Sequence, residues 1–344
     1  MTSATQAQHP GVRTEESKRL RIGFAGVGWI GRNRMKAILA RDSCEVAGIV
    51  EPSEELAQSA RELTRPDAAI CSYEELLRSK PDGIVIATPN SLHAQQAVAA
   101  LKNGVAVFCQ KPIGRNLQET QQVIDAARTA DRLFHADFCY RFVRGVTQIR
   151  ELVRTGALGR VFATEFVFHN AYGPDKPWFY DPVRSGGGCL IDLGIHLVDL
   201  ALWILDFPKL RGISGNLFSA GSRFRRSETY VEDYATAKLQ FENDSVATIA
   251  CSWKSHLGRN AAIEVAAFGG HGGARLRNVD GSFFDFVTES FRGTQSEILS
   301  EPPEEWGGRA ALEWISQLER NNHFDPRAEQ YAASAAILDR IYGL

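Results

Sequence analysis

Three glycines spaced as G-x-G-x-x-G, at Gly26, Gly28 and Gly31, place the strongest constraint on what this chain can fold into. They directly follow the apolar run 20–25 (LRIGFA), which predicts a buried strand, and they open the helical pattern 32–41. Glycines at a strand-to-helix turn allow a tight bend and let the backbone approach a phosphate group at the helix N-terminus. The spacing and its context therefore predict a dinucleotide-binding unit.

A carboxylate at Glu51 completes this pattern, because it ends the next predicted strand, 45–50 (EVAGIV). A carboxylate at this position accepts hydrogen bonds from ribose hydroxyls and repels a 2′-phosphate. The sequence therefore predicts NAD as the cofactor, with NADP less favoured. The residues of this unit that we expect to contact the cofactor are Gly26, Gly28, Trp29, Ile30, Gly31 and Glu51.

Short apolar runs alternate with helical patterns from residue 20 to residue 110, which is typical of a parallel sheet covered on both faces. We assign a doubly wound parallel sheet of the Rossmann type to residues 20–140. Beyond it, turn signals separate strand-like runs, so we expect a second α/β domain at 141–344 with a large, mostly antiparallel open sheet. Those runs lie at 213–218, 233–241, 246–254, 262–268 and 274–278, and helical patterns close the chain at 308–321 and 326–342.

Length, net charge and cysteine spacing indicate the number of domains, the kinds of partner and the compartment to expect. A length of 344 residues favours two domains over one, and a net charge of −2 gives no electrostatic reason to expect nucleic acid or an anionic membrane as a partner. The six cysteines are scattered without a C-x-x-C, which favours reduced thiols in the cytoplasm and predicts no metal site. Residues 1–19 are polar and lack the apolar stretch of a secretory signal, so we expect a disordered tail.

The segment 190–205 (LIDLGIHLVDLALWIL) is apolar nearly all round, which predicts a buried helix. Its charged or titratable residues are Asp192, His196 and Asp199, and they share one stripe of such a helix. Burying an acid and an imidazole one turn apart is costly unless they are paired or line a cleft. Asp192 and His196 are therefore candidate reaction partners, with a hydrogen-bonded structural pair as the alternative, and Asp199 is expected to be structural.

Two further loops follow predicted strands at the same edge of the sheet. The loop after strand 83–87 carries Thr88, Pro89, Asn90 and His93, which we expect near the cofactor. The alternative for Asn90 is capping of the helix that follows, and His93 is more structural than catalytic in character.

Gln110 and Lys111 end the strand 105–109 at this same edge. Their position aims them at the nicotinamide end of the cofactor. Most lysines are instead solvated surface charges, so physics alone leaves both interpretations of Lys111 open.

A polar loop rich in aromatic residues precedes the glycine run 185–188. It carries Asn170, Trp178 and Tyr180, whose amide and aromatic faces suit stacking and hydrogen bonding to a sugar ring. An ordinary packed loop is the alternative interpretation. Trp253, further along the chain, is expected to be a core residue.

Taken together, these motifs resemble the glucose-fructose oxidoreductase, inositol dehydrogenase and rhizopine-catabolism oxidoreductase (Gfo/Idh/MocA) family, over nearly the whole chain from about residue 20. The motifs that carry the resemblance are Gly26–Gly31 after a strand, Thr88-Pro89-Asn90 with His93, Lys111-Pro112, Tyr140-Arg141-Phe142, the run 185–188 leading into Asp192 and His196, and Glu232-Asp233. The resemblance implies an NAD(P)-dependent oxidoreductase that acts on a sugar or cyclitol hydroxyl, as a homodimer or homotetramer.

The resemblance also implies roles for individual residues. His196 becomes the acid/base on the reacting hydroxyl, Asp192 holds the substrate, and Lys111 lies near that oxygen and the nicotinamide ribose. Tyr140 and Arg141 join the substrate-binding set. One departure is Gln110, where the family usually has Glu; the lost carboxylate should lower the pKa of Lys111 and alter how the cofactor ribose is held.

Two other functions remain open at this point. One is a redox-neutral elimination or glycoside cleavage in which NAD is reduced and regenerated in place. The other is a catalytically silent regulator that senses dinucleotide or sugar. Retention of Lys111, Asp192 and His196 speaks against the regulator, because a sensor does not need an acid/base set.

Overall fold

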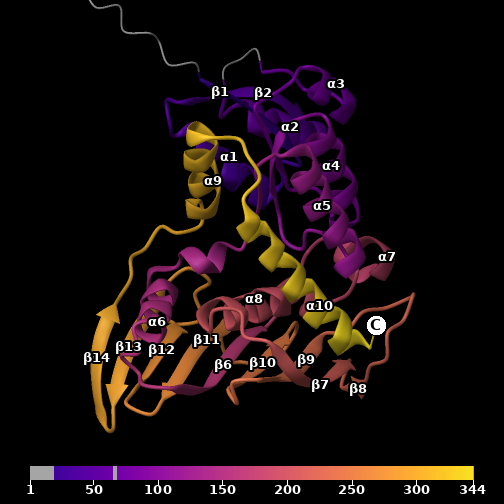
Figure 1. Ribbon diagram of the computed structural model, residues 1–344. Helices are drawn as coiled ribbons and strands as arrows, with labels where there is room; N and C mark the ends of the chain where they lie inside the picture. Colours follow the sequence, from indigo (N-terminus) through magenta and orange to yellow (C-terminus); the bar gives the residue numbers. More distant parts are fainter. Residues whose placement is uncertain (1–18, 65–67, 344) are drawn as a thin grey trace, which may run out of the picture.

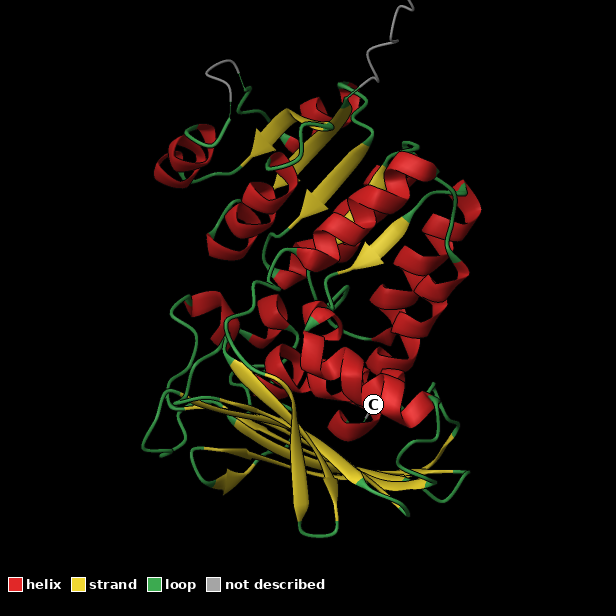
Figure 2. Ribbon diagram, turned by 90° about the vertical axis from the view of Figure 1, so that its left-hand side faces the viewer, coloured by secondary structure: helices red, strands yellow, loops and turns green. Residues whose placement is uncertain are grey.

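The computed structural model describes residues 19–64 and 68–343. The tail predicted at 1–19 therefore lies outside the described residues, except for Arg19. Two sheets organise the described part, one for each half of the chain (Figures 1 and 2).

The first sheet has five strands in the order β2-β1-β3-β4-β5, and every neighbouring pair is parallel. The order reverses between β1 and β3, which makes the carboxyl ends of these two strands the switch point of the sheet. The strands and helices of this half are β1 (Leu20–Ala25), α1 (Trp29–Leu39), β2 (Cys44–Val50), α2 (Glu54–Arg61), α3 (Tyr73–Arg78), β3 (Gly83–Ile86), α4 (Asn90–Lys102), β4 (Ala106–Cys109), α5 (Leu117–Ala130) and β5 (Phe134–Ala136). The predicted doubly wound parallel sheet is confirmed.

The second sheet has nine strands in the order β14-β13-β12-β11-β6-β10-β9-β7-β8. All pairs are antiparallel except β10 with β6, so the predicted mostly antiparallel sheet is also confirmed. Its strands are β6 (Val161–Asn170), β7 (Leu210–Ser219), β8 (Ser222–Arg223), β9 (Tyr234–Phe241), β10 (Val246–Ser252), β11 (Ala261–Gly269), β12 (Gly273–Asn278), β13 (Phe286–Arg292) and β14 (Gln295–Ser300). The sequence did not predict β8, β13 and β14.

Helices cover the face of this sheet that looks toward the first half of the molecule, and Figure 2 shows its other face open. They are α6 (Arg144–Arg154), α7 (Pro182–Ser185), α8 (Ile195–Ile204) and α10 (Gln330–Tyr342), with short 3₁₀ turns at η1 (Cys139–Phe142), η2 (Pro177–Tyr180) and η4 (Pro326–Glu329). The stretch Pro182–Ile204 is long and apolar enough to span a membrane by length and composition, but 89% of its most apolar window is buried inside the protein. We therefore describe it as a core segment.

The segment 190–205 is not the regular helix that the sequence predicts. It begins with a π-helical turn, η3 (Leu190–Gly194), and continues as α8. Asp192 lies in the π turn, whereas His196 and Asp199 lie in the α-helix. The three residues therefore do not share the one regular helix that the sequence predicted. Single π turns inside helices are frequent at functional sites.

After β14 the chain returns to the first half of the molecule. Helix α9 (Arg309–Arg320) contacts α1 and β4, and α10 contacts both α5 and α8. Figure 1 shows α9 beside α1, away from the nine-stranded sheet. The division of the chain at residue 140 stays a proposal, and α9 joins the first half in space although it follows the second in sequence.

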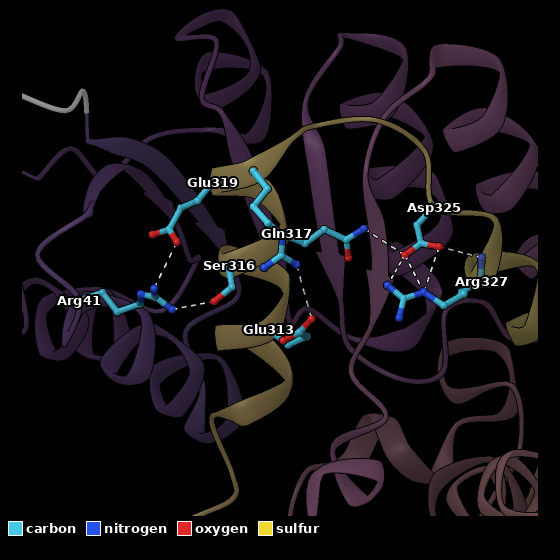
Figure 3. A network of polar contacts seen from close by, with 8 residues as sticks. Arg41, Glu313, Ser316, Gln317, Glu319, Asp325 and Arg327 are labelled. Carbon is cyan, nitrogen blue, oxygen red and sulfur yellow. Dashed lines mark hydrogen bonds and ion pairs between the residues drawn. The ribbon is translucent and has the colours of Figure 1, made fainter. Parts of the chain in front are cut away.

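Polar contacts hold this returning segment in place (Figure 3). Arg41, which follows α1, donates hydrogen bonds to Ser316 Oγ at 2.9 Å and to Glu319 Oε2 at 3.2 Å. On the other side of the same part of α9, Gln317 Nε2 donates to Asp325 Oδ2 at 3.0 Å. The end of the chain is thus attached to the first half at several points.

Candidate functional site

The glycine turn between β1 and α1 has the shape of a phosphate cradle. Gly26 adopts φ +82°, and a Cβ on Gly31 would lie 2.1 Å from the Gly26 carbonyl oxygen, so both positions require glycine. A Cβ on Gly28 would meet only the Nζ atom of Lys176, at 2.9 Å. Apart from this flexible side-chain end, no atom of the described residues fills the space in front of Gly28, which fits the approach of a dinucleotide pyrophosphate to the N-terminus of α1.

The carboxylate of Glu51 lies at this turn. Its Oε2 accepts a hydrogen bond from the Val27 amide at 3.0 Å, and its Oε1 accepts one from the Ser53 amide at 3.1 Å. These backbone donors fix the carboxylate between the ends of β1 and β2, as a ribose-binding group requires. Trp29, the first residue of α1, is 65% exposed, while Ile30 is partly buried.

The loop after β3 is held by side chains that bind backbone atoms. Both ring nitrogens of His93 lie against carbonyl oxygens, Nδ1 at 2.6 Å from Pro112 and Nε2 at 2.7 Å from Thr88. His93 thus joins this loop to the loop that carries Lys111, which is a structural use. Pro89, without a side-chain hydrogen bond, occupies the N-cap of α4. Asn90 instead donates from Nδ2 to the Ser185 carbonyl at 2.8 Å, so the alternative interpretation, in which Asn90 caps α4, is not found.

Gln110 lies in a buried polar network below the loop that follows β4. Its amide donates to Asp137 Oδ2, and Arg34 Nε donates to the same oxygen at 2.6 Å. Asp137 is 0% exposed, and its other oxygen, Oδ1, has no hydrogen-bond partner in the described part of the chain. The negative charge in this region is therefore carried by Asp137, not by residue 110.

Lys111 and Asp192 meet at the centre of the site, as the resemblance implies. Lys111 Nζ donates to Asp192 Oδ1 at 2.7 Å and to the Asp192 carbonyl oxygen, also at 2.7 Å. The other carboxylate oxygen, Oδ2, accepts a hydrogen bond from the indole of Trp253 at 3.2 Å. This ion pair joins the first sheet, at the end of β4, to the π turn of the second half.

His196, on the first turn of α8, is 5% exposed, and among the described residues its Nδ1 has no hydrogen-bond partner, so the alternative of a hydrogen-bonded pair with Asp192 is not found. Burial lowers the pKa of His196 well below its ordinary value, and the positive charges of Lys111 and Arg34 lower it further. Tyr140 packs edge-on against its ring, with centroids 4.9 Å apart. The imidazole is therefore neutral near pH 7, which is the form that can accept a proton.

Arg141, expected to bind substrate, is instead engaged within the protein. Its Nε and Nη2 donate to the two carboxylate oxygens of Asp199 at 2.7 and 2.6 Å. Burial raises the pKa of Asp199, and the Arg141 charge opposes that shift. This bidentate pair is structural, as expected for Asp199, and the geometry gives Arg141 no contact with Lys111 or His196.

The glycine run before the π turn approaches protein backbone. A Cβ on Gly188 would lie 1.9 Å from the carbonyl oxygen of Glu232. The buried Glu232 carboxylate accepts hydrogen bonds from the Gly188 and Leu190 amides at 3.0 and 2.9 Å, and from Tyr342 Oη at 2.8 Å. Burial raises the pKa of Glu232, and these donors oppose the rise.

The aromatic loop before this run lies next to Asp192. Tyr180 packs against Trp253 with ring centroids 5.6 Å apart, and Trp178 stacks on Phe179 at 3.8 Å. Asn170 ends β6, and its buried Oδ1 has no hydrogen-bond partner among the described residues. An unsatisfied buried acceptor of this kind suits a ligand hydroxyl.

Sequence reasoning missed three side chains of this region. Trp253 was expected in the core, and it is buried, yet its N–H binds Asp192. Asp137 and Lys176 were not singled out. Asp137 follows β5 at the carboxyl edge of the sheet, which is a signal that could have found it. Lys176 carries no local signal, because its contact with Gly28 depends on the arrangement of two distant segments.

The site combines a neutral imidazole, a carboxylate and an ammonium beside a dinucleotide-binding turn. This set can remove a proton from a hydroxyl and stabilise the developing negative charge on its oxygen. Among residues 19–64 and 68–343, no group of three or more His, Cys, Asp or Glu side chains could hold a metal ion.

Comparisons with known proteins agree with this geometry. The chain is 27% identical to the D-glucoside 3-dehydrogenase of Escherichia coli, over 76% of this chain and 78% of that protein. It is 26% identical to the 2,7-anhydro-N-acetylneuraminate hydratase of Escherichia coli, over 69% and 64% of the two chains. A solved structure of levoglucosan dehydrogenase with NADH and levoglucosan superposes with a TM-score of 0.79 and 20% identity, covering 94% of this chain and 96% of that one.

Two family descriptions match consecutive parts of the sequence. Residues 20–138 match the oxidoreductase family with an NAD-binding Rossmann fold, and residues 146–275 match the GFO/IDH/MocA C-terminal domain. Both matches belong to one family, and together they cover most of the chain. This protein is therefore a member of the GFO/IDH/MocA oxidoreductase family.

Proposed function

We propose that this enzyme is an NAD-dependent dehydrogenase that oxidises a secondary alcohol of a sugar or cyclitol. One observation carries the proposal: the Lys111–Asp192 ion pair lies next to a neutral, buried His196 at the carboxyl edge of the dinucleotide-binding sheet. The names of the relatives support the substrate class, since they include a glucoside dehydrogenase and a levoglucosan dehydrogenase.

The residues divide the reaction between them. Asp192 holds the substrate hydroxyl, and His196 removes its proton as the carbon gives up hydride. Lys111 stabilises the negative charge that develops on the oxygen. The bound nicotinamide supplies the hydride acceptor, so the products are a ketone, NADH and one proton. Tyr140, Asn170, Trp178 and Tyr180 would line the substrate side.

The choice of NAD over NADP rests on Glu51. Its carboxylate is held at the ribose-binding position by the Val27 and Ser53 amides, where it repels a 2′-phosphate. The positions of Thr88, Pro89 and Lys111 at the carboxyl edge of the sheet support contacts with the nicotinamide end of the cofactor, whereas the Gln110 side chain is buried against Asp137 and would act on that end only from below.

Initial rates of NADH formation test this proposal, measured over a panel of sugars and inositols with NAD and NADP compared. His196→Ala should lower turnover about 10²–10⁴-fold, the usual contribution of a positioned base, while the dissociation constant for NAD stays unchanged. His271→Ala, at an exposed turn far along the chain, is the matched control. Undiminished turnover in His196→Ala would contradict the assignment.

A redox-neutral reaction is the second candidate, and one observation favours it: a relative of similar identity is named a hydratase. In that reaction the same base would act while NAD is reduced and regenerated in place. Substrate consumption without net NADH, on an enzyme that keeps its NAD through gel filtration, would establish this candidate.

We further propose a cytoplasmic homodimer or homotetramer. The open face of the nine-stranded sheet, seen in Figure 2, supports association of subunits. Sedimentation velocity at micromolar concentration measures the oligomeric state directly.

A further inference from the structure

The cradle at Gly28 is reached by a side chain from the other half of the chain. Among residues 19–64 and 68–343, and apart from the residues next to it in the chain, a Cβ on Gly28 would meet only Lys176 Nζ within 4 Å, at 2.9 Å. Gly28 is the second glycine of the turn, where backbone approaches the pyrophosphate of a bound dinucleotide. A primary ammonium group therefore lies where that diphosphate would bind.

The backbone around Lys176 is fixed, although its side chain is exposed. We call residues 171–180 the strap. Tyr180 Oη donates to the Pro174 carbonyl at 2.9 Å and so closes the strap on itself. A Cβ on Gly173 would lie 2.1 Å from this hydroxyl, and Pro177 starts the 3₁₀ turn η2. These contacts set the position from which Lys176 extends.

The strap also packs against a second loop, and that loop contacts the first turn of α1. Tyr172 packs edge-on against Phe283, with ring centroids 6.2 Å apart. The next residue, Phe284, lies 6.4 Å from the ring of Trp29 in the first turn of α1. The strap and the Phe283–Phe284 loop thus approach the same turn from the second half of the chain.

Lys176 has no anionic partner of its own. Within residues 19–64 and 68–343, its ammonium makes no ion pair and no hydrogen bond. Two sources of positive potential therefore face each other here: the Lys176 ammonium and the N-terminal end of the α1 dipole. An anion between them would be stabilised by both.

We propose that Lys176 binds the pyrophosphate of the dinucleotide across the cleft, so that the strap closes one side of the cofactor site. The inference rests on the dinucleotide binding of the proposed function but not on the identity of the sugar. It is equally independent of the choice between NAD and NADP, because both carry the diphosphate. Lys176 contributes to cofactor affinity and takes no part in proton transfer.

The strap also connects this contact to the chemistry. Its last residue, Tyr180, packs on Trp253, whose indole N–H binds Asp192 Oδ2. A dinucleotide that holds Lys176 would therefore hold the strap over the substrate-binding carboxylate as well. Two aromatic side chains, Tyr180 and Trp253, thus join the strap to Asp192.

Isothermal titration of the full-length protein with NAD and with ADP-ribose tests the inference without any turnover. Lys176→Met should weaken the binding of both ligands about tenfold, the usual contribution of one charge-assisted hydrogen bond, and Lys176→Arg should retain most of the affinity. Raising the ionic strength should weaken wild-type binding more than Lys176→Met binding. Lys209→Met, an exposed lysine before β7, is the matched control.

The outcomes separate the two proposals. Wild-type protein that binds neither ligand contradicts the proposed function itself. Wild-type binding with equal dissociation constants and equal salt dependence in Lys176→Met overturns the role of Lys176 and leaves the proposed function intact. Adenosine, which has no phosphate, serves as a competitor whose inhibition constant should be the same in all variants.

Discussion

At the scale of single residues, the acid that pairs with the buried Arg34 is Asp137, and position 110 supplies an amide. Asp137 is fully buried and shares one oxygen, Oδ2, between the Arg34 guanidinium and the Gln110 amide. The amide can donate to that oxygen, whereas a carboxylate cannot. A glutamate at position 110 would place two acids on one guanidinium in a medium that screens their repulsion poorly.

We therefore expect Gln110→Glu to lower the free energy of unfolding by about 2–4 kcal/mol at neutral pH. Adding Asp137→Asn to Gln110→Glu should restore most of that loss, because a single acid again faces Arg34. Urea denaturation of the wild type, both single variants and the double variant gives the coupling energy. Additive effects of the two changes would show that the residues do not share the charge.

Candidate residues could be singled out from two kinds of local pattern. Lys111 follows a strand at the carboxyl edge of the sheet, Asp192 is a charged position in an apolar segment, and the structure brings the two side chains to 2.7 Å of each other. Arg141 was assigned to the substrate because its motif says nothing of Asp199, with which it pairs in the fold. Contacts such as Trp253 with Asp192 join segments far apart in sequence, so no local pattern reveals them.

At the scale of elements, the start of the π turn depends on a single acid. Glu232 accepts hydrogen bonds from two backbone amides before and within η3, and it is fully buried. Amides at a helix start have no partner within the helix, and leaving them unsatisfied in the interior costs about 1–3 kcal/mol each. Glu232 thus fixes where the turn that carries Asp192 begins.

Glu232→Ala should lower the free energy of unfolding by about 3 kcal/mol and disturb the position of Asp192. Turnover should therefore fall in a fully folded sample, while NAD affinity changes little. Glu228→Ala, an exposed acid on the preceding loop, is the control for the loss of one negative charge. Equal thermal stability of the two variants would contradict the capping role.

Elements were predictable where burial imposes a clear pattern. The buried parallel strands read as continuous apolar runs, and strand-like runs between turn signals predicted β7, β9, β10, β11 and β12 of the large sheet. The last strand, β14 (QSEILS), is exposed or half-exposed throughout, so it has no apolar face to detect. The π turn was missed because its composition is that of an ordinary buried helix.

At the scale of the whole molecule, the end of the chain completes the first half. Trp314 of α9 is fully buried, and a Cβ on Gly83 of β3 would lie 2.6 Å from its ring. The sheet therefore depends on a helix that is about 230 residues away in sequence. Sequence order alone assigns α9 to the second half, since nothing local to α9 indicates which sheet it covers.

The same returning segment packs against β5 through η4 and leaves His135 half-buried. Burial lowers the pKa of His135 to about 4 from an ordinary 6.5; of the nearby charges, Asp325 raises it and Arg327 lowers it. In the unfolded chain the imidazole takes up a proton below pH 6.5, whereas the folded protein resists protonation until about pH 4. The stability that comes from the neutral folded form is therefore complete above pH 6.5 and is lost as the pH falls toward 4.

The free energy of unfolding of the wild type should consequently fall more steeply with acidification than that of His135→Gln. The difference in slope should approach about 1.4 kcal/mol per pH unit between pH 6.5 and 4. Urea denaturation at several pH values measures both curves, and the carboxylates shared by the two proteins cancel in the difference. Parallel curves would mean that the pKa of His135 is not lowered in the folded protein, and therefore that the packing of η4 against β5 does not shield this imidazole from water.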